Sequence, residues 1–157
     1  MKIRVLIADD HGIVRDGLSA LLRDHHGMEV LGAVSNGRDA VARALALKPD
    51  VVVMDASMPD LNGIDATRKI VAALPDTRVV ALSMHDDRRF VNGMVEAGAR
   101  AYLLKDCVSD ELVSAIKMVH RGQLFFSHRL TTIVMAHISH GAGRKHPFDT
   151  LSERERK

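Results

Sequence analysis

The hydrophobic residues of this chain form short apolar runs that alternate with stretches of helical spacing. Five runs are short and almost wholly apolar, which is typical of strands buried on both faces. They span residues 3–8, 28–34, 51–54, 78–82 and 101–104. Between the first two, Val14, Leu18, Leu21 and Leu22 recur at helical spacing. This repeat of strand and helix predicts an α/β fold, with a parallel sheet, helices on both faces and right-handed crossovers.

Polar side chains stand where four of the five predicted strands end. Asp9 and Asp10 follow the first strand, Asp55 the third, Ser83 the fourth and Lys105 the fifth. The carboxyl ends of parallel strands lie at one edge of a sheet, so these groups should lie close together. Three neighbouring carboxylates repel one another unless a cation lies among them. Mg²⁺ is the usual candidate for oxygen ligands beside phosphate.

Each of these residues also has an ordinary structural explanation on its own. Aspartate and serine are common helix caps, and lysine is mostly solvated at the surface. Capping, however, requires no lysine, and it gives no reason for four polar groups to share one edge. The joint pattern therefore favours a functional site over a set of unrelated caps.

The same residues resemble the receiver domain of two-component response regulators. The resemblance rests on Asp9-Asp10, on Asp55 with Met58-Pro59 behind it, on Ser83, and on residues 97–105. It covers residues 1–122, which we expect to form the receiver domain. It implies a flavodoxin-like, doubly wound sheet of five strands in the order 2-1-3-4-5.

The resemblance also implies a phosphorylation site with a bound metal ion. Asp55 would take a phosphoryl group from a sensor histidine kinase, as carboxylate nucleophiles do elsewhere. Asp10, Asp55 and the backbone carbonyl of Ser57 would bind Mg²⁺, with Asp9 acting through water. The protein would catalyse only its own phosphorylation and dephosphorylation, and would not otherwise be an enzyme.

Three further residues acquire roles from the resemblance. Lys105 and the Ser83 hydroxyl would contact the phosphoryl oxygens, and Tyr102 would turn inward when Ser83 moves. A half-buried tyrosine on an edge strand fits the position of Tyr102 equally well by propensity. His11 directly follows the acidic pair, where it could perturb the metal site, but we expect a surface histidine at the start of a helix.

The chain beyond the receiver predicts two further segments. Residues 123–147 are expected to form a helical segment and a Gly-rich, basic linker. In residues 148–157, Ser152 and Glu155 have capping-box spacing, and the stretch resembles the opening of the helix-turn-helix domain of NarL/FixJ (LuxR-type) regulators. That domain reads DNA with its second helix, which this sequence does not reach. His137 and His140 have a spacing compatible with metal, but a solvated helix face is favoured.

Composition is consistent with a cytoplasmic regulator. Residues 1–125 hold 16 Lys/Arg against 17 Asp/Glu, and the remainder holds 6 against 3, so only the tail is basic. The single cysteine, Cys107, allows no internal disulfide, and no apolar run is long enough to span a membrane. The expected partners are a sensor histidine kinase, DNA through a C-terminal domain, and a second copy in a phosphorylation-linked homodimer.

The sequence is less consistent with three other functions. A stand-alone receiver that signals by protein contact is the main alternative, which the segment after residue 147 disfavours. An aspartate-nucleophile phosphatase would carry a second aspartate at position 57, where this chain has Ser57. A dinucleotide-binding enzyme would need a Gly-rich turn after the first strand, and Asp9-Asp10-His11-Gly12 is not one.

Overall fold

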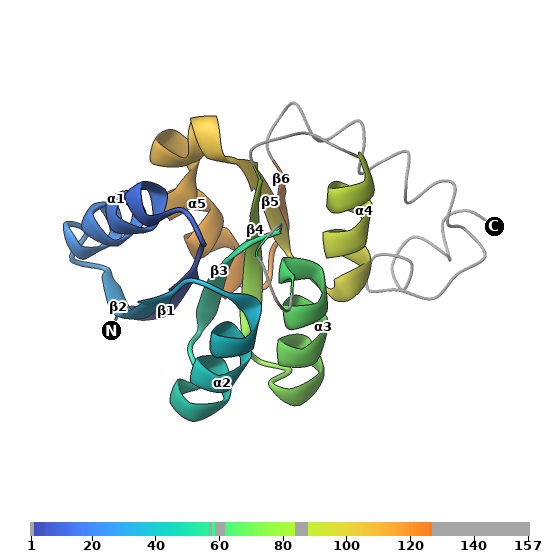
Figure 1. Cartoon of the computed structure of the whole chain (residues 1–157). Coiled ribbons are helices and arrows are strands. Elements are labelled where there is room, and N and C mark those ends of the chain that lie inside the picture. The colour runs from blue at the N-terminus through green and yellow to red at the C-terminus, as the bar shows by residue number, and fades with distance from the viewer. Residues whose placement is uncertain (1, 57, 59–61, 84–87, 127–157) are drawn as a thin grey trace.

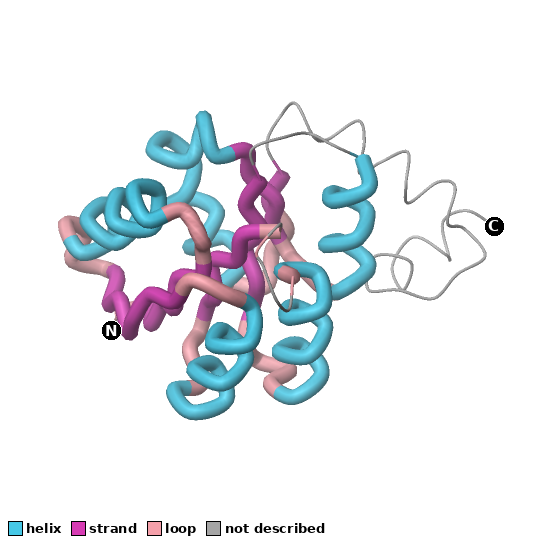
Figure 2. The backbone as a smooth tube through the Cα atoms, in the orientation of Figure 1, coloured by secondary structure: helices cyan, strands magenta, loops and turns pink. Residues whose placement is uncertain are grey.

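A parallel sheet forms the central layer of the molecule, with helices against both of its faces (Figures 1 and 2). The computed structural model describes residues 2–56, 58, 62–83 and 88–126, without the side chains of 88–90 and 107–110. Ser57 and residues 127–157 therefore lie outside the described residues. The latter include all but the first four residues of the predicted helical segment and linker, the segment resembling a helix-turn-helix, His137 and His140. Among the described helices, none is long and apolar enough to cross a membrane.

The sheet confirms the predicted strands and their order. The strands are β1 (Ile3–Ala8), β2 (Met28–Val34), β3 (Val51–Asp55), β4 (Arg78–Ser83), β5 (Ala101–Leu104) and β6 (Phe125–Phe126). They pair in the order β2-β1-β3-β4-β5-β6, and all pairs are parallel. The predicted order 2-1-3-4-5 is therefore present, with one additional strand at the β5 edge.

The additional strand β6 forms because the chain turns back sharply after the last helix. Gly122 has φ of +86°, a left-handed conformation that glycine adopts at little cost. Phe125 then donates its N–H to the Arg100 carbonyl at 3.1 Å and pairs with Ala101. Two residues are too few to show the apolar pattern that identifies a strand in a sequence, so the sequence predicts only five strands.

Within the described part of the chain, five α-helices connect the strands, and the first contains the residues at helical spacing between the first two strands. They are α1 (Gly12–Arg23), α2 (Gly37–Leu47), α3 (Gly63–Ala73), α4 (Arg88–Ala97) and α5 (Val108–His120). Asn36 caps α2 by accepting the Asp39 N–H at 2.8 Å, and Asn62 caps α3 in the same way.

Two hydrophobic clusters hold the helices against the sheet. One lies under α2, α3 and α4 and includes Ala44, Ile70 and Met94. The other lies under α1 and α5 and includes Leu22 and Ile116. Figure 1 shows the same division, with α1 and α5 on one side of the strands and the other helices opposite. Because both faces of the sheet are covered, its strands are apolar at nearly every position.

The start of α3 packs directly on the end of β3, where Asp55 lies. Gly63 donates its N–H to the Ala56 carbonyl at 3.2 Å. A Cβ at Gly63 would stand 2.0 Å from the Asp55 carbonyl oxygen and 2.8 Å from Ala56 Cα. Both neighbours are backbone atoms and cannot rotate aside, so only glycine fits here.

We expect Gly63→Ala to lower the free energy of unfolding by about 1–3 kcal/mol, the usual cost of overpacking. The matched control is Gly17→Ala, at an exposed position of α1 where a Cβ would meet nothing within 4 Å. That substitution should raise the free energy of unfolding by about 0.5–1 kcal/mol through helix propensity. Urea denaturation of the two variants measures both effects, and equal stabilities would contradict the close approach of α3 to β3.

Candidate functional site

The carboxyl ends of four adjacent strands bring polar side chains to one edge of the sheet. Asp9 directly follows β1, Asp55 ends β3, Ser83 ends β4 and Lys105 directly follows β5. All four residues are buried, and Asp9 and Asp55 are wholly inaccessible to solvent. Ionisable groups are rarely buried unless they are paired, so the charges of these buried carboxylates need a cationic partner.

Lys105 is the buried cation of this site. Its Nζ lies 2.9 Å from Asp9 Oδ2 and 3.2 Å from Asp55 Oδ2. Only 3% of the lysine side chain is exposed. The residue lies directly after β5, at the start of the short 3-10 helix Lys105–Cys107. One ammonium thus neutralises part of the charge of two carboxylates that solvent does not reach.

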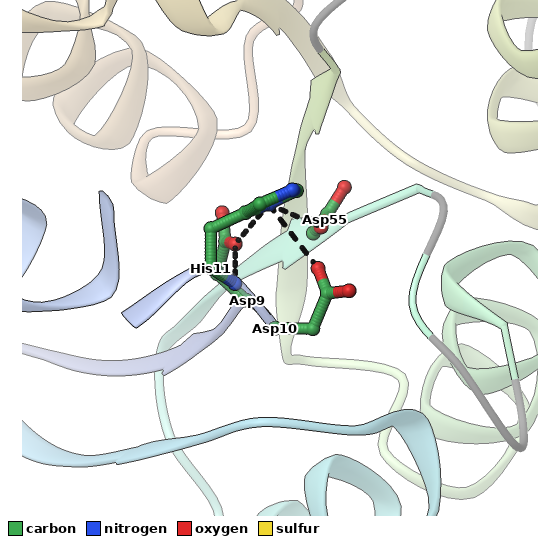
Figure 3. A group of neighbouring side chains, drawn as sticks. All are labelled: Asp9, Asp10, His11 and Asp55. Carbon is green, nitrogen blue, oxygen red and sulfur yellow. Dashed lines mark hydrogen bonds and ion pairs between the residues drawn. The ribbon is translucent and has the colours of Figure 1, made fainter. Parts of the chain in front are cut away.

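His11 makes contacts that are not expected of a surface histidine at the start of a helix. It is the N-cap of α1 and its side chain is 50% exposed, which agrees with the expected surface histidine. Its ring nitrogen Nδ1, however, lies 3.2 Å from both Asp9 Oδ1 and Asp10 Oδ1, and 3.9 Å from Asp55 Oδ2 (Figure 3). The same Nδ1 is 3.1 Å from Lys105 Nζ. The ring is therefore part of the acidic cluster.

Asp10 is the most accessible carboxylate of the cluster, with 30% of its side chain exposed. Burial raises the pKa of Asp10, and so do a hydrogen bond with Asp55 and the charge of that residue, while the charge of His11 opposes them. Folding therefore favours protonated Asp10, and this contribution to stability is lost as the pH rises through its raised pKa. At neutral pH the ionised carboxylates repel one another, which a bound cation would relieve.

Comparison with known proteins identifies the family. The model of the response regulator receiver domain matches residues 5–117, which is more than half of the chain. This chain belongs to the response regulator receiver family. The match ends close to the receiver boundary predicted from the sequence.

Relatives of this receiver are response regulators of the same type. It is 39% identical over 153 residues to the response regulator GacA of Pseudomonas viridiflava, covering 98% of this chain and 72% of GacA. It is 40% identical over 155 residues to the transcriptional regulatory protein MctR of Rhizobium johnstonii, covering 99% and 70%. A LuxR-family two-component response regulator from Aurantimonas sp. SI85-9A1 superposes with a TM-score of 0.80 at 31% identity, covering 87% and 97%.

The donor atoms of this receiver fit a divalent cation. Asp9, Asp10, His11 and Asp55 each offer one ligand atom, and these atoms all lie within 4.8 Å of one another. Three carboxylates face a single lysine, so negative charge is in excess when the histidine is neutral. Oxygen ligands suit Mg²⁺, and the imidazole nitrogen widens the choice to other divalent cations.

Tyr102 occupies the interior of the receiver and not an edge. Its side chain is fully buried within the cluster under α2, α3 and α4. Strand β6 covers the β5 edge, where Phe126 pairs with Tyr102. The alternative of a half-buried edge tyrosine is therefore wrong, because β6 lies beside β5 and β5 is not an edge strand. Ser83 lies one strand away, where it pairs with Leu104.

Proposed function

We propose that this receiver is a phosphorylation switch in a transcription regulator, with Asp55 as the acceptor of the phosphoryl group. The observation that carries the proposal is the position of Asp55 between a buried lysine and an acidic pair. Its Oδ2 lies 3.2 Å from Lys105 Nζ, at the carboxyl end of the central strand β3. An ordinary buried aspartate needs one cationic partner and no further carboxylates, so this arrangement favours phosphoryl chemistry over a structural ion pair.

In the proposed reaction, an Asp55 carboxylate oxygen attacks the phosphorus of a kinase phosphohistidine. The P–N bond to that histidine breaks as an acyl phosphate forms on Asp55. Asp10, Asp55 and the Ser57 carbonyl would hold Mg²⁺, with Asp9 acting through water. The chemistry that Mg²⁺ would supply there is neutralisation of charge on the phosphoryl oxygens during transfer.

The signal then passes through residues on the neighbouring strands. Lys105 shifts from the Asp55 carboxylate to a phosphoryl oxygen, for which its compact charge is suited. The Ser83 hydroxyl donates to another phosphoryl oxygen, and Tyr102 repacks in the space that Ser83 leaves. The buried positions of both residues support this coupling, since closely packed groups change between discrete arrangements.

We further propose that the receiver controls a DNA-binding domain. The support is the alignment with MctR, named a transcriptional regulatory protein, which extends over 155 residues and thus past the receiver. In this proposal residues 1–122 are the receiver, 123–147 connect it, and 148–157 begin the DNA-binding domain. The receiver works in the cytosol, with a sensor histidine kinase as its phosphoryl donor and a second copy as its partner after phosphorylation.

The test is the intact mass of the protein after incubation with acetyl phosphate. With Mg²⁺ present, we expect the chain to gain one phosphoryl group. Addition of excess EDTA should abolish the gain, because Lys105 alone leaves the pocket negatively charged. A gain that persists without any divalent cation would contradict the metal-dependent mechanism, and no gain in either case would contradict Asp55 as an acceptor from small donors.

A further inference from the structure

The ring of His11 lies where a metal ligand is needed. We propose that His11 Nδ1 binds the divalent cation of this receiver directly, so that the site prefers cations that accept nitrogen ligands, such as Mn²⁺, over Mg²⁺. This inference rests on the metal site of the proposed function. It assigns that site a nitrogen donor in addition to the oxygens.

The distances match those between ligands of one octahedral ion. Ligands at about 2.1 Å from a cation are about 3.0 Å apart when adjacent and about 4.2 Å apart when opposite. Nδ1 of His11 is 3.2 Å from the nearest oxygens of Asp9 and Asp10, and 3.9 Å from Asp55 Oδ2. The distance to Asp10 suits adjacent ligands, and the distance to Asp55 approaches the value for opposite ones, while Asp9 would act through water. A cation could thus accept both Asp10 and Asp55 together with the ring nitrogen.

Hydrogen bonding within the protein does not account for these contacts. Lys105 has an ammonium that can only donate, so the 3.1 Å contact with His11 Nδ1 needs a free lone pair on the nitrogen. A hydrogen bond from Nδ1 to an oxygen of Asp9 or Asp10 would instead need a proton on that nitrogen, because an ionised carboxylate only accepts. One nitrogen atom cannot satisfy both requirements. A cation bound to Nδ1 would take the lone pair that Lys105 otherwise approaches, and the carboxylate oxygens would offer lone pairs to the same cation.

The backbone holds the ring in this position. His11 donates its own N–H to Asp9 Oδ1 at 2.8 Å, and the Arg15 guanidinium donates to the Asp9 carbonyl at 2.9 Å. These two bonds fix the backbone of the turn between β1 and α1, so the Cα of His11 is already in place when a cation binds. Half of the side chain stays exposed, which leaves a path for the cation.

The preference for Mn²⁺ follows from ligand chemistry. Imidazole suits first-row transition metals, whereas Mg²⁺ favours oxygen ligands and keeps several waters. In the native chain the nitrogen should therefore add more to the affinity for Mn²⁺ than to that for Mg²⁺. Replacement of His11 by alanine should therefore reduce the difference in affinity between Mn²⁺ and Mg²⁺.

The experiment is pulsed EPR of Mn²⁺ bound to the full chain, with titrations of Mn²⁺ and Mg²⁺. The native chain should show ¹⁴N modulation from a coordinated imidazole, and His11→Ala should lose it. We expect His11→Ala to bind Mn²⁺ at least about tenfold more weakly and Mg²⁺ within about a factor of two of native. The control is His120→Ala, which removes an exposed histidine at the far end of α5 and should behave as native.

The outcomes separate this inference from the proposed function. Binding of Mn²⁺ without ¹⁴N modulation, or modulation that survives in His11→Ala, overturns the role of His11 and leaves the oxygen site intact. Failure of the native chain to bind either cation overturns the metal site of the proposed function itself, and the role of His11 with it.

Discussion

Asp55→Asn is expected to fold and yet gain no phosphoryl group from acetyl phosphate and Mg²⁺. An amide oxygen is a weak nucleophile and cannot form the acyl phosphate, so the loss should be complete. The substitution keeps the shape of a side chain that is wholly buried and removes one of three neighbouring carboxylates. The free energy of unfolding should therefore change by no more than about 1 kcal/mol.

The measurement for Asp55→Asn is intact mass beside a urea denaturation curve. The control is Asp16→Asn on the exposed side of α1, which should be phosphorylated as the native chain is. A phosphoryl group on Asp55→Asn would mean that a neighbouring carboxylate, such as Asp9 or Asp10, serves as the acceptor.

Lys105→Met is expected to cause the largest loss of stability, about 3–5 kcal/mol at neutral pH. The ammonium lies 2.9 Å from Asp9 Oδ2 and 3.2 Å from Asp55 Oδ2, and both carboxylates are fully buried. Its removal leaves two buried carboxylates without their cation. The large expected loss comes mainly from these uncompensated buried charges. The same variant should be phosphorylated poorly, because the cation that contacts the phosphoryl oxygens is absent.

Urea denaturation measures this loss, with Lys69→Met on the exposed face of α3 as the control. The control should change the free energy of unfolding by less than about 0.5 kcal/mol. Adding Asp55→Asn to Lys105→Met should recover part of the loss, with a coupling of about 0.5–3 kcal/mol. If Lys105→Met is no less stable than the control, the ion pairs do not stabilise the fold.

The strands and helices of this receiver are encoded in short stretches of sequence. Strands that are buried on both faces must be apolar at nearly every position, so five runs could be recognised without any structure. The resemblance to receivers then supplied the strand order. Strand β6 could not be predicted, because its two residues owe their conformation to Gly122 and to the free edge of β5. The burial of Tyr102 depends on that same strand.

The candidate site divides in the same way. The polar residues at strand ends were visible in the sequence, because parallel strands present their carboxyl ends at one edge. Their distances were not visible, and the sequence favoured a surface histidine over one that contacts the acidic residues, which His11 does. The helix-start position of His11 was correct, but a residue at an N-cap can direct its ring outward or back over the strand ends.

The sequence alone therefore determined the alternation of strands and helices, the edge where chemistry is expected, and the residue types found there. Only the tertiary structure decided which of those residues touch. Lys105 meets His11 across 94 positions of the chain, and the same lysine contacts both Asp9 and Asp55. Periodicity reports on neighbours within a few residues, whereas such contacts depend on how the whole sheet twists and how its helices pack.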